Sequence, residues 1–175
     1  MPILSRIRTI PDYPKKGIQF RDITTLLKDR DGFRHTIDRL AERYAGKKID
    51  KIAAIESRGF IIGAPLAHIL GAGFVPVRKK GKLPADTVGR DYELEYGVDR
   101  VEIHTDAIQP GDKVLLVDDL VATGGTAGAA ASLINEVGGE IVECAFVIDL
   151  PDLGGSKRLT QAGYQVFSLC HFAGE

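Results

Sequence analysis

The stretch VLLVDDLVATGGTAGAA, from Val114 to Ala130, joins an apolar run, two adjacent acids and a glycine-containing turn. Four apolar residues lead into Asp118 and Asp119, and the turn opens an alanine-rich segment that favours a helix. A nearly all-apolar strand is typical of a parallel sheet that helices cover on both faces. The stretch therefore predicts an α/β fold with an open, mainly parallel sheet that is flanked by helices.

The rest of the chain alternates short apolar runs with segments of helical pattern, and it contains no internal repeat. In residues 31–44, for example, Phe33, Ile37 and Leu40 fall on one helical face. On this basis we expect strands at 51–56, 74–78, 113–118, 140–150 and 164–170, and helices at 31–44, 59–71, 126–138 and 154–163.

Prolines interrupt this pattern at three places. Residues 10–24 are punctuated by prolines, so we expect irregular structure there with one short strand at 18–20. Pro65 falls within the helix expected at 59–71, near enough to its start to be tolerated. Pro76 suggests that its strand lies near an edge of the sheet.

Length and composition restrict the class of protein. The chain has 175 residues, 44% hydrophobic and 27% charged, which fits one globular domain. A formal net charge of −1 argues against nucleic-acid binding through bulk positive charge. The sequence holds no apolar run of the roughly 18 residues that a membrane span needs. Cys144 and Cys170 lie in strand-like runs, so we expect buried thiols in a reducing cytoplasm.

The turn after the two acids has the features of an anion site. Ligands of open parallel sheets bind at the carboxyl ends of the strands, and the expected strand ends at Asp118. Backbone N–H groups of the Gly124–Gly125 turn, the threonine hydroxyls and the start of the helix can converge on a phosphate. The simpler interpretation, a helix start capped by Thr126 with Asp119 favouring the helix dipole, explains one acid and leaves the glycine pair unexplained.

The two acids imply a second part of the ligand. Carboxylates that faced a phosphate would repel it, so Asp118 and Asp119 must face something else. Vicinal sugar hydroxyls or a hydrated Mg²⁺ suit them. A ribose 5-phosphate carries a phosphate and a diol at the required separation, and it is the ligand that the stretch favours.

Two other phosphate motifs do not fit. A P-loop needs a Ser or Thr after Gly-Lys, and Leu83 stands there in the Gly-Lys-Leu sequence at 81–83. A dinucleotide fingerprint needs a third glycine where the segment that starts at Gly71 has a proline.

A long polar segment breaks the alternation of strands and helices. Residues 79–109 contain two alternating runs, 92–96 and 100–104, around Gly97. A surface hairpin is the simpler interpretation. Compact domains seldom carry so long an insertion without a function, however, and a mobile lid is the usual one. We therefore expect a lid.

Several motifs resemble one enzyme family. Residues 114–126 resemble the motif with which the type I phosphoribosyltransferases bind PRPP, 5-phosphoribosyl-1-pyrophosphate. IPDYPKKGIQFRDIT (10–24), ESRGF (56–60), VRKKGKLP (77–84) and YELEYG (92–97) resemble members of that family that use adenine. The resemblance covers essentially the whole chain. It implies a single domain, 1–175, of the type I phosphoribosyltransferase fold, with an N-terminal hood at about 1–30 and a flexible lid at about 79–109.

The resemblance also implies a role for each motif in binding PRPP. The 5-phosphate would be held by Ala122, Thr123, Gly124, Gly125 and Thr126, and the ribose hydroxyls by Asp118 and Asp119. The pyrophosphate would be contacted by Ser57, Arg58, Arg78, Lys79 and Lys82. A solvated basic surface is the alternative for the last three of these residues, and a surface ion pair is the alternative for Arg58.

Adenine would be bound by the hood and the lid. Phe20 would stack on the base, backbone groups of Gln19 and Arg21 would contact its edge, and Leu120 would pack on it. Glu95 would reach N7 of the purine and act with Arg58 in catalysis. Judged from the residues alone, a phenylalanine such as Phe20 is more often a core residue than a base platform, and an exposed position is the default for Glu95. Glu93 has the same strand parity as Glu95 and could be confused with it.

The implied reaction is the Mg²⁺-dependent transfer of the phosphoribosyl group from PRPP to adenine, which gives AMP and pyrophosphate. The magnesium would be held mainly by PRPP and water, without direct protein ligands, and the enzyme would be a cytoplasmic homodimer with no nucleic-acid or membrane partner. Transfer to another purine base is the alternative reaction. A regulatory protein that kept the PRPP fold is the alternative class, and the near-neutral charge argues against it.

Overall fold

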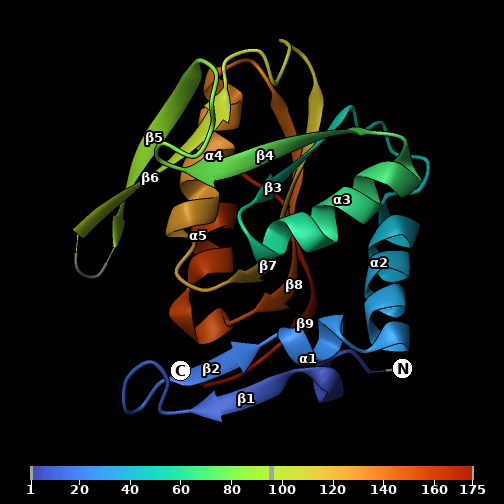
Figure 1. The fold of residues 1–175 in the computed structure, drawn as a ribbon, viewed down its shortest axis with the longest axis vertical. Coiled ribbons are helices and arrows are strands. Elements are labelled where there is room, and N and C mark those ends of the chain that lie inside the picture. The colour runs from blue at the N-terminus through green and yellow to red at the C-terminus, as the bar shows by residue number, and fades with distance from the viewer. Residues whose placement is uncertain (1, 95–96, 175) are drawn as a thin grey trace.

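The structure is a computed structural model that describes residues 2–94 and 97–174. Its centre is a seven-stranded sheet in the order β5-β6-β4-β3-β7-β8-β9 (Figure 1). The five strands from β4 to β9 in this order are parallel, and β5 and β6 run antiparallel to their neighbours. The prediction of a mainly parallel sheet is therefore confirmed. The strands are β3 (Lys51–Ile55), β4 (Gly73–Lys79), β5 (Thr87–Leu94), β6 (Gly97–His104), β7 (Lys113–Val121), β8 (Glu140–Asp149) and β9 (Val166–His171).

Helices cover both faces of the sheet (Figure 1). On one face lie α2 (Arg30–Tyr44) and α3 (Arg58–Leu70), and on the other lie α4 (Gly125–Glu136) and α5 (Gly155–Gln161). Alternate residues of each strand supply the two cores: Leu115 of β7 packs toward α3, and Leu116 packs toward α4. Cys144 and Cys170 are both buried and free, as expected.

The four expected helices lie within two residues of their expected bounds, and one expectation, the position of Pro65, is corrected. Asp29 caps α2 by accepting a hydrogen bond from the Gly32 backbone at 2.6 Å. Pro65 lies in the middle of α3 rather than near its start. The helix persists because Ile62 and Leu66 are fully buried against the sheet, which compensates for the missing hydrogen bond of the proline. Among the described residues, no helix combines the length and apolar character needed to span a bilayer.

The hairpin of β5 and β6 extends the sheet beyond β4. The two alternating runs expected around Gly97 form this hairpin, in which Thr87 pairs with His104 and Leu94 with Gly97. β6 joins β4 only at Arg78 and Lys79. The proposed edge position of Pro76 is therefore corrected: β4 is an inner strand by order, and Pro76 is tolerated because the β6 pairing begins beyond it.

The N-terminal segment forms a separate two-stranded sheet. β1 (Arg8–Pro11) and β2 (Gln19–Asp22) pair antiparallel, and they are flanked by a short 3-10 helix, Leu4–Arg6, and by α1 (Thr24–Leu27). We expected one strand at 18–20; the strand begins one residue later and ends at Asp22, and β1 was missed. Figure 1 shows this hairpin lying beside the C-terminal segment at one end of the sheet. We call β1 and β2 with the loop between them the hood hairpin.

Candidate active site

The two acids lie inside a strand and not at its end, which corrects the sequence prediction. β7 continues to Val121 because β8 keeps pairing with it, with Leu120 opposite Ile148 and Val121 opposite Asp149. Successive side chains of a strand point to opposite faces. Even so, both acids interact with Arg58 at the start of α3, and they interact with each other.

The turn beyond β7 encloses a small hollow of about 180 Å³. The backbone turns at Gly124, whose φ of 80° is left-handed and favours glycine, and α4 begins at Gly125. Thr126 therefore does not cap the helix, and this part of the simpler interpretation was wrong. First-turn N–H groups of a helix have no partner within the helix, which makes the hollow suited to an anion. It is lined by Asp118, Leu120, Val121, Ala122, Thr123, Gly124, Gly125, Thr126 and Ala127.

The start of α5 packs against the backbone of this turn. The Gly155 backbone N–H donates to the Ala122 carbonyl at 2.9 Å. A Cβ at Gly155 would lie 2.3 Å from the Ala122 oxygen and 2.7 Å from the Gly124 nitrogen. Only glycine allows this approach. We missed this contact in the sequence, although the Gly154–Gly155 pair before a helix was a visible signal.

Asp118 and Asp119 lie beneath the N-terminus of α3. Arg58 Nε donates to Asp119 Oδ2 at 2.5 Å, and the Asp119 backbone N–H donates to Asp118 Oδ1 at 2.8 Å. A Cβ at Gly59 would lie 2.9 Å from Asp118 Oδ1, so glycine is needed where the helix meets the acids. Burial, and then the charge of Asp119, raise the pKa of Asp118 well above its ordinary value of 3.8.

Arg58 is held in its charged form by acids around it. Burial lowers its pKa, but the hydrogen bond and charge of Asp119 and the charges of Asp118 and Asp22 outweigh burial and raise it. The side chain remains about half exposed, at 49%. The guanidinium therefore lies between the buried acids and the solvent-facing side of the site.

A second arginine is positioned by Glu56, at the end of β3. Glu56 accepts from Arg78 Nε and from the Lys79 backbone N–H, both at 2.8 Å, and Arg78 Nη1 donates to the Lys82 carbonyl at 3.2 Å. Burial raises the pKa of Glu56, but the two hydrogen bonds outweigh it and lower the pKa. Ser57 and Arg58 follow Glu56 directly, so the ends of β3 and β4 bring Ser57, Arg58 and Arg78 to one edge. Sequence reasoning missed Glu56.

The lysines predicted for pyrophosphate are placed differently from Arg78. The Lys79 ammonium is held by the Tyr92 hydroxyl and by Asp99, both on the β5–β6 hairpin. Lys82 lies in the exposed turn after β4, where its backbone N–H donates to the Lys79 carbonyl at 3.3 Å. Arg78 thus links the turn that contains Lys82 to Glu56, which precedes Ser57 and Arg58, whereas the ammonium of Lys79 contacts the hairpin.

The predicted adenine residues lie on β2 and β7. Phe20 is half-buried and packs edge-on against Tyr13, with ring centroids 5.2 Å apart, so it is not part of the main core. The Arg21 guanidinium lies 4.5 Å from the centre of the Phe172 ring and donates to Thr9 Oγ1 at 2.6 Å. Arg21 also pairs with Thr9 in the β1–β2 ladder. Gln19 begins β2, and Leu120 lines the hollow.

Glu95, the predicted acid–base residue, lies outside the described residues. The strands on either side of it are described, and β5 passes the turn of the hollow: a Cβ at Gly125 would lie 3.6 Å from both the Glu93 carbonyl and the Tyr92 ring. The β5–β6 hairpin therefore borders the same site as the acids and the turn.

Comparison with known proteins agrees with this geometry. The phosphoribosyl transferase domain family matches residues 24–166. An adenine phosphoribosyltransferase of Nitrosospira multiformis is 71% identical over 99% of both chains. The crystal structure of the adenine phosphoribosyltransferase from Thermoanaerobacter pseudethanolicus is 54% identical, covers 97% of this chain and 98% of its own, and has a TM-score of 0.92.

The solved relatives include one with a base bound. The Saccharomyces cerevisiae adenine phosphoribosyltransferase, complexed with an imino-altritol bisphosphate and adenine, is 40% identical over 96% of both chains, with a TM-score of 0.89. The full-length relatives extend over the hood hairpin, which the family match from residue 24 does not include. The chain belongs to the phosphoribosyltransferase family, and the full-length relatives reported above are adenine phosphoribosyltransferases.

Proposed function

We propose that the chain transfers the 5-phosphoribosyl group of PRPP to adenine and releases AMP and pyrophosphate. The observation that carries this proposal is the hollow at the end of β7, where a glycine turn suited to an anion and Asp118 line one space. A phosphate with a diol attached matches this pair of features. Relatives that span the whole chain, hood included, carry the name of this activity.

The turn and the acids would bind the ribose phosphate at both ends. Amides of the turn hold the 5-phosphate, and Asp118 accepts hydrogen bonds from ribose hydroxyls. Asp119 is already paired with Arg58, so it acts mainly by fixing that guanidinium. As the bond from C1 to pyrophosphate breaks, positive charge develops on the ribose, and the nearby carboxylates stabilise it.

The departing pyrophosphate would meet the two arginines at the neighbouring strand ends. Arg58 and Arg78 come from adjacent strand termini and are each oriented by a carboxylate, Asp119 and Glu56 respectively. Arginines fixed in advance stabilise charge on a leaving group without reorganising during the reaction. The protein then needs no nucleophile, because N9 of adenine attacks C1 directly.

Water must be kept from the reacting ribose. We propose that residues 79–109 act as a lid and that Glu95 exchanges a proton with N7 of the base as general acid–base. The β5–β6 hairpin is suited to this because it already borders the turn that holds the phosphate. Stacking on Phe20 would align the base with C1.

We also propose Mg²⁺ as the cofactor. Among the described residues, no group of three or more potential ligand side chains lies together, and Asp118 is the carboxylate that lines the hollow. This donor set suits a hydrated ion that is carried by PRPP, with Asp118 accepting from its waters or from the ribose. When bound, the ion would supply charge neutralisation to the diphosphate.

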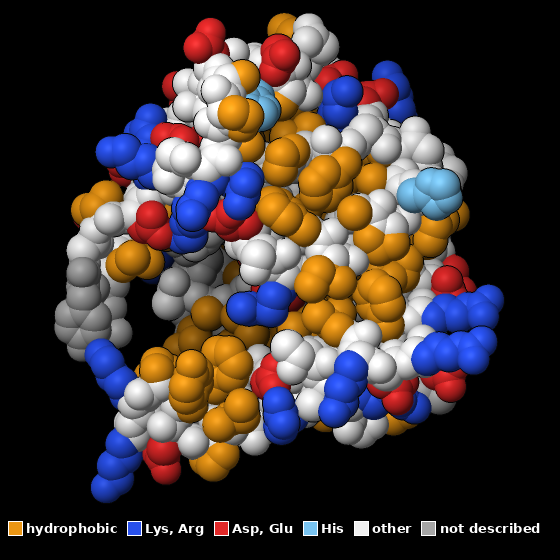
Figure 2. Space-filling model, viewed as in Figure 1, with side chains coloured by type: hydrophobic (Ala, Val, Ile, Leu, Met, Phe, Trp, Pro, Cys, Tyr) orange, Lys and Arg blue, Asp and Glu red, His pale blue; other side chains and the backbone are white. Residues whose placement is uncertain are grey.

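A homodimer is the assembly that we propose. Figure 2 shows hydrophobic side chains gathered over α3 and β4. Ile61 and Ile69 of α3 and Phe74 of β4 are 44%, 52% and 38% exposed. Phe74 of β4 packs edge-on against Phe60 of α3, so aromatic side chains of the two elements are in contact. A second copy on this face would lie next to Arg58 and Lys79, the residues at which α3 begins and β4 ends.

Direct assay tests the reaction. Purified protein with adenine, PRPP and Mg²⁺ should form AMP and pyrophosphate in equal amounts, and chelation of the metal should stop the reaction. Guanine, hypoxanthine and xanthine run in parallel test the choice of base. Absence of AMP in the presence of Mg²⁺ would reject the proposal, and faster reaction of another base would keep the transfer but replace adenine.

A further inference from the structure

The position of the hood hairpin depends on the contacts at its base. β2 carries the adenine residues, and it pairs with β1 alone, outside the seven-stranded sheet. An isolated two-stranded hairpin is marginally stable in water. The loop between the strands, residues 12–18, is exposed along its length. The end of the hairpin nearest the sheet must therefore decide where the base-binding strand lies.

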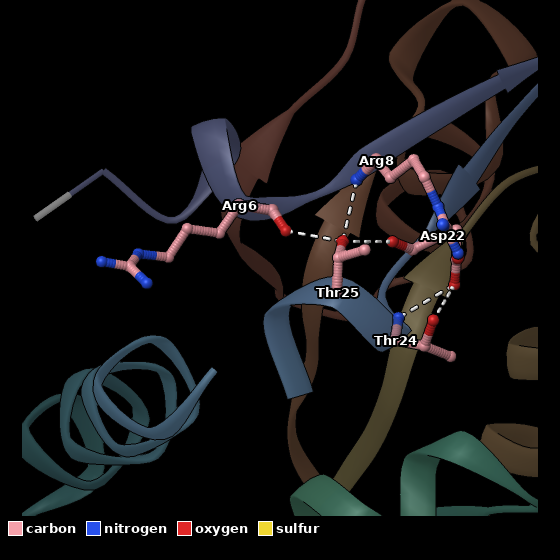
Figure 3. Close-up of polar contacts among 5 residues, drawn as sticks. All are labelled: Arg6, Arg8, Asp22, Thr24 and Thr25. Carbon is pink, nitrogen blue, oxygen red and sulfur yellow. Dashed lines mark hydrogen bonds and ion pairs between the residues drawn. The ribbon is translucent and has the colours of Figure 1, made fainter. Parts of the chain in front are cut away.

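Asp22 closes that end (Figure 3). It is the last residue of β2 and is 7% exposed. Its Oδ2 accepts from Arg8 Nε at 3.1 Å, and Arg8 is also its cross-strand partner on β1. Its Oδ1 accepts from the Thr24 backbone N–H at 2.9 Å and from the Thr24 hydroxyl at 2.7 Å. One carboxylate thus joins both strands of the hairpin to the start of α1.

Thr25 ties the same point to the beginning of the chain (Figure 3). Its hydroxyl lies 2.7 Å from the Arg6 carbonyl, to which it can donate, and accepts from the Arg8 backbone N–H at 3.1 Å. The segment that enters β1 and the segment that leaves β2 are therefore locked together. α1 in turn is anchored by Leu26, which is fully buried in the core.

The charge of Asp22 also acts across the site. Hydrogen bonds from Thr24 and then from Arg8 lower its pKa to about 2, so the carboxylate stays ionised at neutral pH. It is one of the acids that stabilise the charged form of Arg58. Its effect on Arg58 is smaller than those of Asp119 and Asp118, so loss of the Asp22 charge leaves Arg58 held in its charged form by those two acids.

We infer that Asp22 is a positioning residue for the nucleobase: by fixing β2 to β1 and α1, it sets where Phe20 and the backbone of Arg21 meet adenine. It lies two residues from Phe20 along the strand. The inference rests on the proposed function. It assigns Asp22 to the base subsite and not to the PRPP subsite, and the kinetics of the two substrates separate these possibilities.

Asp22→Asn tests the inference, with Asp29→Asn as the matched control. Asp29 has the same chemistry in the same N-terminal segment, since it accepts a backbone N–H at the start of α2 and pairs with an arginine, Arg6. It is not on β2. Both variants are compared with the unaltered enzyme for thermal unfolding, for kcat, and for the KM values of adenine and of PRPP.

We expect both variants to lose thermal stability and only Asp22→Asn to change recognition of the base. Its KM for adenine should rise by about tenfold, since small displacements of a positioned substrate cost that much or more, while its KM for PRPP stays within about twofold. A merely structural role would lower the active fraction, and thus kcat, and leave both KM values unchanged.

Three results would overturn the inference: equal changes in the two KM values, unchanged KM values in a destabilised Asp22→Asn, or the same adenine effect in Asp29→Asn. If Asp22→Asn does not fold, Thr24→Ala removes only the 2.7 Å hydroxyl bond to Asp22, and the same adenine-specific rise is required of it. Failure of the proposed function is distinct, because the unaltered enzyme would then form no AMP.

Discussion

Arg58 and Asp119 form an ion pair in which Nε and Oδ2 lie 2.5 Å apart, between the start of α3 and the end of β7. The carboxylate is almost buried, with 9% of its side chain exposed, whereas 49% of the arginine side chain is exposed. The charge of Asp119 is therefore balanced before any substrate binds. Asp118 lines the hollow. The charge of Arg58 also lowers the pKa of Asp118, but burial and Asp119 outweigh it, so the two adjacent acids differ in their electrostatic surroundings.

This difference predicts how Asp118 affects stability with pH. Burial and then Asp119 raise its pKa above the unfolded value of 3.8, so the ionised form is disfavoured in the folded protein. Below pH 3.8 the carboxyl group is protonated in both states, so its raised pKa does not change the free energy of unfolding. Above the raised pKa the buried carboxylate is ionised, and the free energy of unfolding is lowered by the full cost. Asp118→Asn should therefore raise the melting temperature at pH 8, and the gain should vanish as pH falls below 4. Melting curves across this pH range measure it.

The same substitution should weaken binding of PRPP. An asparagine cannot form the charge-assisted hydrogen bond to a hydroxyl, which predicts a loss of about tenfold in affinity. Asp119→Asn is the control: it leaves Arg58 without its partner, so it should lower stability at pH 8 instead of raising it. A destabilised Asp118→Asn, or unchanged affinity for PRPP, would contradict the assignment of Asp118 to the ribose.

Gly155 should prove as necessary as the residues of the turn itself. A methyl group there must push Ala122 and Gly124 aside, because its Cβ would lie 2.3 Å from one and 2.7 Å from the other. Overpacking of this kind costs about 1–3 kcal/mol in stability, and the displaced turn should raise the KM for PRPP more than the KM for adenine. Steady-state kinetics and chemical unfolding of Gly155→Ala measure both effects.

Gly128→Ala provides the matched comparison for Gly155→Ala. Gly128 lies on α4, three residues beyond Gly125, and the nearest atom to its Cβ would be Leu159 Cδ2 at 3.9 Å. Alanine favours a helix over glycine by up to about 1 kcal/mol, so this variant should be as stable as the parent or slightly more stable. Equal effects of the two substitutions would show that the support of the turn by α5 is unimportant.

The apolar face over α3 and β4 gives a prediction about assembly. Ile69→Asp should convert the protein to monomers, because a charge cannot be buried without a partner at a dimer interface. Ile18→Asp is the control, since Ile18 is similarly exposed, at 42% against 52%, and lies in the loop of the hood hairpin. Light scattering coupled to gel filtration measures the mass. A parent protein that is already monomeric would reject the homodimer.

Much of the fold could be predicted because its signals are local. The apolar run before Asp118 and the face formed by Ile37 and Leu40 depend on neighbouring residues, and the corresponding strand and helix begin within one residue of the expected positions. The glycine pair is also a local signal of the turn, because Gly124 adopts a positive φ that favours glycine. These features need no knowledge of distant parts of the chain.

The missed features depend on contacts between distant residues. β7 extends past Asp118 because β8 pairs with it, and β1 exists because β2 lies opposite it. Gly155 donates a hydrogen bond to Ala122, which lies 33 residues earlier in the sequence. The ammonium of Lys79 pairs with Asp99, which lies on the β5–β6 hairpin. Neither periodicity nor composition contains this information, so the roles of such residues required the structure.

The last prediction concerns Glu95, which lies between β5 and β6 in the sequence. If Glu95 exchanges a proton with the base, Glu95→Gln should lower kcat by about 10²- to 10⁴-fold, the usual contribution of general acid–base catalysis, and leave the affinity for PRPP nearly unchanged. Glu93→Gln is the control, because Glu93 is an exposed acid of the same strand parity and pairs with Val98. Its kcat should stay close to that of the parent. Rapid-quench measurement of AMP formation separates the chemical step from product release. Equal losses in kcat and in PRPP affinity for Glu95→Gln would make this residue a binding group, and a larger loss in Glu93→Gln would transfer the role to Glu93.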